Sequence, residues 1–387
     1  MKSPVITLFI LMSELPFNIF SMKNTKPIYL SFFTLLLFPA LLSAQHLKPG
    51  FDKAEYKELM LISARSTTDS AYYNTFPEPQ HFKIVYHSPE MGLANMWDLW
   101  KGDKSVAVIS IRGTTSKQES WLANFYSAMV PAKGSLQLSD NDVFEYDLAP
   151  NPKAAVHVGW LLSTAYLSRD MLPKIDSCYK AGTHEFLIVG HSQGGGIAYL
   201  LTAYLYNLQK QKLIPSDIRF KTYGSASPKP GNLYFAYDYE ALTQKGWAFN
   251  VVNTADWVPE TPVSVQTLYD FNATNPFVDV QSVFKKQKFP KNLVMKHVFK
   301  KMEKPARKAQ RNYEKYLGDM TSKLITSYLP DFIPPQYYPS SNYVRTGSTV
   351  VLHADETYYK LYPDDKANVF AHHAHTQYLY LLEHLEE

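Results

Sequence analysis

The sequence of 387 residues contains a single cysteine, Cys178. One cysteine cannot form an internal disulfide, and it leaves a metal site without a second thiolate. We therefore expect Cys178 to be a small buried side chain in the helix before the strand at residues 186–189. No internal repeat is visible. The length and the 45% share of hydrophobic residues allow one large domain with insertions or two small domains, and we favour the first.

The first 44 residues have the pattern of an export leader. A basic segment at residues 22–26 precedes an apolar run at residues 28–42, and small residues ending at Ala44 form a typical cleavage site. We predict cleavage after Ala44, with translation starting at Met22 or with an unusually long leader. An uncleaved membrane anchor is the alternative, which Pro39 and the short apolar run disfavour. The chain is then secreted or resides in the periplasm or cell envelope.

One sequence motif is typical of a serine that acts as a nucleophile. The apolar run at residues 186–189 stops at Gly190-His191-Ser192-Gln193-Gly194, and a small-residue helical pattern follows at residues 197–205. A buried strand that turns through Gly-x-Ser-x-Gly into a helix exposes the serine hydroxyl on a strained turn. The motif alone also occurs in ordinary loops, but the flanking strand and helix favour Ser192 as a nucleophile.

Short apolar strands alternate with helical stretches along the chain from residue 83 onward. This alternation predicts a mostly parallel sheet flanked by helices. Before the end of the chain we expect strands at residues 83–86, 96–100, 105–111, 186–189, 219–223 and 248–253.

Further segments accompany the serine motif in a fixed order, and they lie at residues 110–114, 121–125, 156–160, 222–224, 228–232 and 252–259. Together they resemble the class 3 (fungal-type) lipases of the α/β-hydrolase superfamily. The resemblance implies an α/β-hydrolase fold and a secreted serine carboxylic-ester hydrolase that acts through an acyl-enzyme. The chain departs from the family at Gln193, where Leu is usual, at Gly196, where Ala is usual, and at Lys229 and Pro230, which replace Arg and Val.

A serine hydroxyl is a poor nucleophile unless an imidazole accepts its proton and a carboxylate orients that imidazole. In this superfamily the acid follows the serine and the histidine comes last. Asp256, just after the strand at residues 248–253, is the expected acid. The alternative role for Asp256 is an Asx-turn before Pro259.

His372, His373 and His375 are the three candidates for the base. The family's histidine is followed by two residues and then by Tyr, and His375 with Tyr378 fits that register. We therefore predict His375 as the base, with His372 and His373 as turn or rim residues. A histidine cluster can also bind a metal, but we expect neither a metal nor a cofactor.

The oxyanion of a tetrahedral intermediate needs preorganised donors. The resemblance implies the backbone N–H of Gln193 and a contribution from Thr114, whose hydroxyl could add a hydrogen bond. Thr114 as a simple turn residue is the alternative. We expect His157 and His191 to serve packing and loop structure.

The stretch between Asp256 and the histidines is longer than the family norm. We predict a helical inserted cap or lid at residues 262–341, which divides a catalytic domain of residues 45–261 and 342–387. Residues 343–347 and 350–352 are then a displaced strand pair. Within the insertion, Lys and Arg cluster at residues 285–311, and Met295, Val298, Phe299 and Met302 share one helical face.

A basic amphipathic helix can lie on an anionic membrane surface, or it can be a cap helix with a solvated basic side. Nucleic acid is not an expected partner of an exported chain. The expected substrate is an acyl ester or lipid, with acylglycerols first. A phospholipase A-type enzyme or a small-ester esterase is the alternative activity, and an inactive lipid-binding protein is the alternative class.

Overall fold

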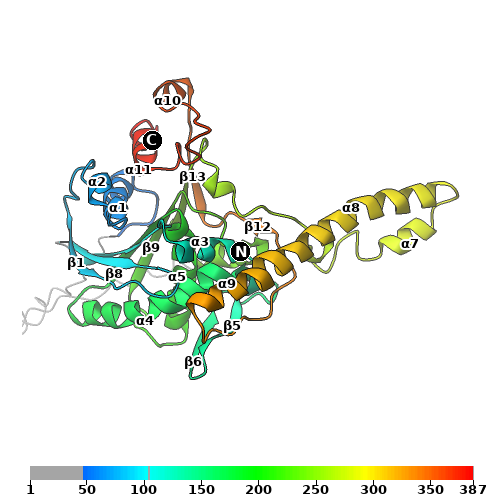
Figure 1. Ribbon diagram of the computed structural model, residues 1–387, viewed down its shortest axis with the longest axis horizontal. Coiled ribbons are helices and arrows are strands. Elements are labelled where there is room, and N and C mark those ends of the chain that lie inside the picture. Colours follow the sequence, from blue (N-terminus) through cyan, green and yellow to red (C-terminus); the bar gives the residue numbers. More distant parts are fainter. Residues whose placement is uncertain (1–46, 103–104, 387) are drawn as a thin grey trace, which may run out of the picture. The chain divides into compact units, whose positions relative to one another are not determined.

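The computed structural model describes residues 47–102 and 105–386. At its centre is a seven-stranded sheet with helices on both faces (Figure 1). The six predicted strands all belong to this sheet, and one further strand completes it. In spatial order the strands are β1 (Phe82–His87), β2 (Trp97–Gly102), β3 (Val106–Ile111), β8 (Glu185–His191), β9 (Arg219–Ser225), β11 (Ala248–Asn253) and β13 (Ser348–Leu352).

The sheet is mixed in direction. β1, β2 and β3 are antiparallel neighbours, whereas β3, β8, β9, β11 and β13 run parallel. The parallel strands all end at one edge, and this edge is where open α/β sheets place their functional loops. Ser192 follows β8 and Asp256 follows β11, so both lie at this edge.

Eleven α-helices occur in the described ranges, together with a π-helical turn at Lys315–Met320 and 3₁₀ turns at Val258–Glu260 and Leu268–Asp270. The α-helices are α1 (Lys53–Arg65), α2 (Ser70–Tyr73), α3 (Gln118–Phe125), α4 (Val158–Lys180), α5 (Gln193–Lys210), α6 (Leu233–Leu242), α7 (Val280–Lys285), α8 (Lys291–Glu314), α9 (Thr321–Tyr328), α10 (Glu356–Leu361) and α11 (His375–Glu383).

Alternate residues of the central strands pack into separate apolar clusters on the two faces of the sheet. On β8, Phe186 and Ile188 pack with residues of α4, α5 and α6. Leu187 and Val189 pack with residues of α1, α10 and α11. Burial on both faces explains why residues 186–189 of this strand are all apolar. Cys178 is buried in α4, as predicted.

A second, four-stranded sheet and a hairpin lie outside the predicted pattern. Tyr343 and Val344 pair with the second sheet, while residues 348–352 join the main sheet, so the predicted strand pair divides between two sheets. The second sheet has the order β12 (Tyr343–Val344), β10 (Gly231–Asn232), β7 (Ala155–His157), β4 (Met129–Pro131), and the hairpin pairs β5 (Lys133–Ser139) with β6 (Asp142–Asp147).

Residues 262–341 are mainly helical and contain α7, α8 and α9. The two ends of this segment meet in an antiparallel bridge, in which the N–H of Val265 donates to the carbonyl of Ser341 at 3.0 Å. The later part packs on the main body, because Phe332 is buried beside Tyr126 and Ala128 N–H donates to Leu317 O. The earlier part, α7 and the start of α8, is largely exposed.

The predicted leader and its cleavage after Ala44 lie outside the described residues. Within the described ranges, none of the helices combines the length and the hydropathy required to span a bilayer.

Candidate active site

Ser192 sits on a strained turn between β8 and α5. Its backbone has φ 60° and ψ −131°, values that place a non-glycine residue in a disfavoured region. The turn is held because the N–H of Ser192 donates to the carbonyl of Ser225 at 2.9 Å. Strain of this kind requires surrounding structure that fixes it. It is the geometry that exposes a nucleophilic hydroxyl at the end of a strand.

Two glycines of the motif allow the strand and helix to approach each other. A Cβ on Gly190 would lie 2.1 Å from the carbonyl oxygen of Gly194. A Cβ on Gly194 would lie 2.2 Å from the carbonyl oxygen of Ile111 on β3. Both distances are far below contact between real atoms, and both neighbours are backbone. The elbow therefore needs glycine at both positions, as the motif predicts.

Asp256 is buried in the turn after β11, and its carboxylate accepts three hydrogen bonds. Oδ2 accepts from His373 Nδ1 at 2.7 Å and from the Tyr378 hydroxyl at 2.8 Å. Oδ1 accepts from Val258 N–H at 3.0 Å. The last bond is an Asx-turn, so the two alternative roles of Asp256 coexist in one side chain.

The structure pairs Asp256 with His373 and not with His375, so the assignment of His375 is corrected. His373 lies in the loop that precedes α11, whereas His375 is the first residue of that helix. Because Nδ1 of His373 donates to the carboxylate, its Nε2 is left as an acceptor. This Nε2 is buried and has no hydrogen-bond partner among the described residues.

The ring of His375 makes its hydrogen bonds to residues other than Asp256. Its Nδ1 lies 2.9 Å from the Tyr72 hydroxyl and its Nε2 lies 3.2 Å from Ser63 Oγ. Burial, followed by the nearby His373, lowers the pKa of His375 to about 3, so the ring is neutral at ordinary pH. His372 is also engaged, with Tyr358 and Asp364.

His191 supports the loop that carries His373. The Nε2 of His191 lies 2.7 Å from the carbonyl oxygen of His373, and its Nδ1 lies 3.1 Å from Ser225 Oγ. Burial lowers the pKa of His191 well below its usual value, with a further contribution from His375. A neutral His191 whose Nε2 carries the proton therefore donates to the His373 carbonyl and anchors the loop beside the elbow.

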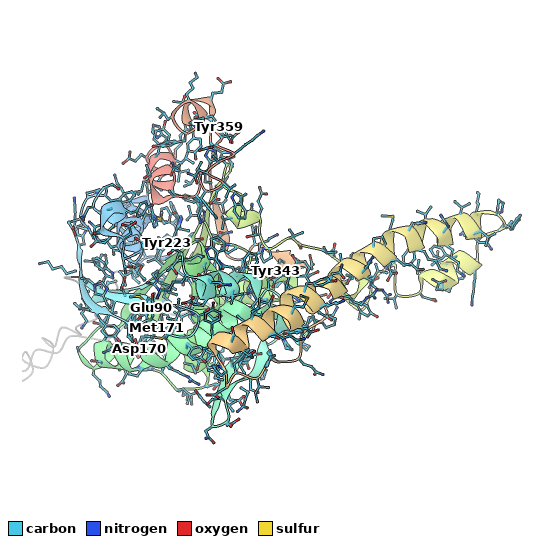
Figure 2. The ribbon with its side chains drawn as sticks, viewed as in Figure 1. Glu90, Asp170, Met171, Tyr223, Tyr343 and Tyr359 are labelled. Atoms are coloured by element: carbon cyan, nitrogen blue, oxygen red, sulfur yellow. The ribbon has the colours of Figure 1, made fainter. Side chains whose placement is uncertain are left out.

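The loop after β3 runs directly against the elbow. A Cβ on Gly113 would lie 3.0 Å from the carbonyl oxygen of His191 and 3.6 Å from Ser192 Cβ. The loop is anchored because Arg112 donates to Glu90 Oε1 at 2.7 Å and to the carbonyl oxygen of Ala94 at 2.8 Å. Hydrogen bonds from Lys117 and then from Arg112 lower the pKa of Glu90 (labelled in Figure 2).

Thr114 follows in this loop with its hydroxyl in a defined hydrogen bond. Asn124 Nδ2 on α3 donates to Thr114 Oγ1 at 2.9 Å. Trp160 Nε1, which can only donate, bonds Asn124 Oδ1 at 3.1 Å and thereby fixes the orientation of the amide. The Thr114 oxygen is an acceptor in this chain of bonds, so its own hydrogen is available to a further acceptor.

His157 supports the same chain. Its Nε2 lies 3.1 Å from the carbonyl oxygen of Asn124, and its ring stacks on Trp160 with centroids 3.7 Å apart. Burial lowers the pKa of His157 to about 3. The contacts of His157 are those expected of a packing residue.

Gln193 begins α5, so no residue within the helix accepts its backbone N–H. This N–H directly follows Ser192. The buried side chain of Gln193 faces α3, where its Nε2 donates to Ser120 O at 3.3 Å. Glutamine thus gives the elbow a polar link to α3 that a leucine at this position could not make.

Aromatic rings lie next to His373. Phe370 has its ring centroid 5.7 Å from that of His373, 6.2 Å from that of Trp121 on α3 and 5.5 Å from that of Trp257. Trp257 and Phe125 are both substantially exposed. The site therefore combines a buried acid and histidine with an apolar surface at its margin.

We expect Thr114→Ala to lower kcat by up to about 10²-fold, because the substitution removes the available hydroxyl hydrogen but keeps the backbone N–H. Thr114→Ser, which keeps the hydroxyl, is the matched control, and its kcat should stay close to that of the parent protein. Steady-state kinetics on a soluble ester measures both. An unchanged kcat in Thr114→Ala would show that the hydroxyl plays no part.

Sequence reasoning did not assign three of these residues. His373 was a candidate that the motif register ranked below His375. Tyr378 was noticed only as a register marker, although it donates to Asp256; burial, and then the negative charge of Asp256, raises its pKa well above the usual value and keeps it a donor. Asn124 lay within a matched segment, but nothing in the sequence indicated its bond to Thr114.

Residues 108–266 match the model of a family described as Lipase (class 3). Over 172 residues the chain is 28% identical to the chloroplastic phospholipase A1-Ialpha2 of Arabidopsis thaliana, which covers 40% of this chain and 32% of that protein. Over 219 residues it is 26% identical to the secreted mono- and diacylglycerol lipase 1 of Fusarium solani, which covers 54% of this chain and 59% of that protein. The match thus spans less than two thirds of either relative.

Solved structures of fungal lipases are also similar. The triacylglyceride lipase of Rhizomucor miehei has a TM-score of 0.41 and 19% identity, over 56% of this chain and 77% of that one. Lipase II of Rhizopus niveus has a TM-score of 0.39 and 23% identity, over 55% of this chain and 75% of that one.

Proposed function

We propose that this chain is a member of the class 3 lipase family, whose model its residues 108–266 match, and that it hydrolyses carboxylic esters of lipids, with acylglycerols as the first substrate class. Ser192 is the nucleophile, His373 the base and Asp256 the residue that orients it. The observation that carries the proposal is the 2.7 Å bond between Asp256 and His373, which leaves beside the elbow a buried Nε2 without a partner among the described residues.

In the proposed reaction, Ser192 Oγ attacks the ester carbonyl carbon while His373 Nε2 accepts the hydroxyl proton. The carbonyl oxygen becomes an oxyanion, which accepts hydrogen bonds from the Gln193 N–H and from Thr114. Collapse breaks the ester bond, and His373 returns the proton to the departing alcohol. Water, deprotonated by His373, then releases the carboxylic acid and restores the serine.

No hydrogen bond joins His373 Nε2 to Ser192 Oγ in the described residues. Bonds between nucleophile and base are often long when no substrate is present and shorten in the reacting complex. The aromatic rings around Phe370 support a lipid substrate, since they place apolar surface where an acyl chain would approach the histidine. A phospholipase A-type activity remains the second candidate, because one relative carries that name.

A substrate series tests the proposal. We expect hydrolysis of p-nitrophenyl esters across several chain lengths, and of dispersed diacylglycerol and triacylglycerol. Release of fatty acid from phosphatidylcholine at a higher kcat/KM than from acylglycerols would instead favour the phospholipase. Turnover of short esters alone would identify an esterase. Absence of turnover on every ester by the folded protein would leave an inactive lipid-binding protein.

A further inference from the structure

Residues 277–306 form an arm that consists of α7 and the first two thirds of α8. Figure 1 shows α7 beside α8 and both apart from the sheet. The two helices contact each other through Phe284 and Phe299, whose ring centroids are 5.6 Å apart. At a rise of about 1.5 Å per residue, the part of α8 from residue 291 to 306 is roughly 24 Å long.

The arm exposes an unusual amount of apolar surface. Of the 25 large apolar side chains that are exposed in the described ranges, nine lie within residues 277–302. They include Phe289 at 79%, Met302 at 74% and Val298 at 51%. Apolar side chains that face water do not stabilise the arm. Exposed apolar patches of this kind mark interaction surfaces.

The arm is also the basic part of the chain. Residues 277–306 contain eight lysines against two acidic residues, Asp279 and Glu303, whereas the rest of the chain has 31 basic against 33 acidic residues. Around α8, Lys296, Lys300 and Lys304 lie on the side opposite the face that Met295, Val298 and Met302 share. Both charge and apolar surface are thus concentrated in one exposed element.

We propose that this arm docks the protein on anionic lipid membranes. Apolar side chains of the arm enter the boundary between headgroups and acyl chains, while the lysines pair electrostatically with anionic headgroups. A nucleic acid would pair with the lysines but would leave the apolar side chains of Phe289, Val298 and Met302 exposed to water. A second copy of the arm would carry the same charge and repel the first.

The docked arm is linked to the candidate site. α8 continues through the π-helical turn at Lys315–Met320 into α9. On α9, the Tyr328 hydroxyl donates to Gln118 Oε1 on α3 at 3.2 Å, and α3 carries the Asn124 that holds Thr114. The arm is therefore continuous with α9, which contacts the helix that carries Asn124.

Vesicle co-sedimentation with the Ser192→Ala protein tests the proposal independently of the proposed activity, because this variant should leave the lipid intact. The vesicles are phosphatidylcholine alone or with about 30% phosphatidylglycerol, at low and high salt. We expect tighter binding to the anionic vesicles and weaker binding in high salt. Changing Lys291, Lys296 and Lys301 to Gln should weaken binding roughly a hundredfold, at about 1 kcal/mol per lysine.

The matched control changes three exposed lysines outside the arm, Lys210, Lys212 and Lys245, to Gln, and should bind as the parent does. A second variant, Val298→Ser with Met302→Ser, should also bind anionic vesicles more weakly. All substituted side chains are exposed, so far-UV circular dichroism should be unchanged. Equal binding to both vesicle types, or equal losses in the arm and control variants, would overturn the proposal.

Discussion

Ser192→Ala should lower kcat by roughly a millionfold, because members of a serine triad act as a unit and loss of the nucleophile removes nearly all of their contribution. Alanine keeps the Cβ and hence the same backbone strain at φ 60°, so the variant should fold. The residual rate measured on a soluble ester gives the effect. A fluorophosphonate should label the parent at Ser192 and leave the variant unlabelled.

Ser216→Ala is the matched control, since Ser216 is exposed and lies away from the site. It should keep both activity and labelling. Full hydrolysis by folded Ser192→Ala protein would remove Ser192 from the mechanism. Labelling of Ser192 without ester turnover would instead indicate that the site is formed but inactive on the esters tested.

His373→Ala should produce a loss comparable to that of Ser192→Ala, because the serine then has no group to accept its proton. His373 is the histidine whose Nδ1 donates to Asp256, and its free Nε2 is the only ring nitrogen of the three neighbouring histidines without a partner in the described structure. Steady-state and single-turnover kinetics on one soluble ester measure the loss in the chemical step.

His375→Gln is the informative comparison. Glutamine can still bond Tyr72 and Ser63, so we expect the variant to keep most of its kcat while its thermal stability falls. His372→Gln should behave similarly. If His375→Gln abolished turnover in the folded protein and His373→Ala did not, the base would be His375 and the geometry around Asp256 would have to rearrange in the reacting complex.

The central sheet was predictable from sequence because its middle strands contain continuous apolar runs, such as residues 106–109 and 186–189, and helical stretches separate several of the strands. Val106–Ile111 and Ala248–Asn253 match the predicted ranges almost residue for residue. The second sheet was not predictable, since strands of two or three residues are too short to show a periodic pattern. The hairpin at Lys133–Asp147 is longer, but apolar residues alternate with polar ones only at residues 136–138 and 144–146, which is too short for a clear strand pattern.

The elbow and the position of Asp256 at the end of its strand could be predicted because both depend on local sequence. Gly190, Ser192 and Gly194 act through backbone geometry within one turn, and Asp256 follows its strand directly. The histidine could not, since the choice between His373 and His375 depends on where α11 begins. Starting the helix at His375 turns that ring toward Tyr72 and leaves His373 in the loop that faces Asp256.

The amphipathic pattern of α8 could also be predicted, because it depends only on residues that are close together in the sequence. A helix does cover Met295 to Met302. The sequence did not indicate that one part of residues 262–341 is buried against the body and the other part is exposed. Phe332 and Ile325 are buried against the body, whereas Val298 and Met302 contact little. Both pairs are apolar, and only tertiary packing distinguishes them.

The parallel pairing of β13 with β11 has a consequence for the time at which the protein can act. Val251 and Val350 are adjacent in the sheet but about a hundred residues apart in the chain, and contacts of such long range form late. A chain that synthesis has carried to residue 341 already contains Ser192 and Asp256, but it lacks both the last strand of the sheet and His373. The proposed lipid hydrolysis therefore begins only after the ribosome has passed His373, so an unfinished chain poses no threat to the membranes of the cell that makes it.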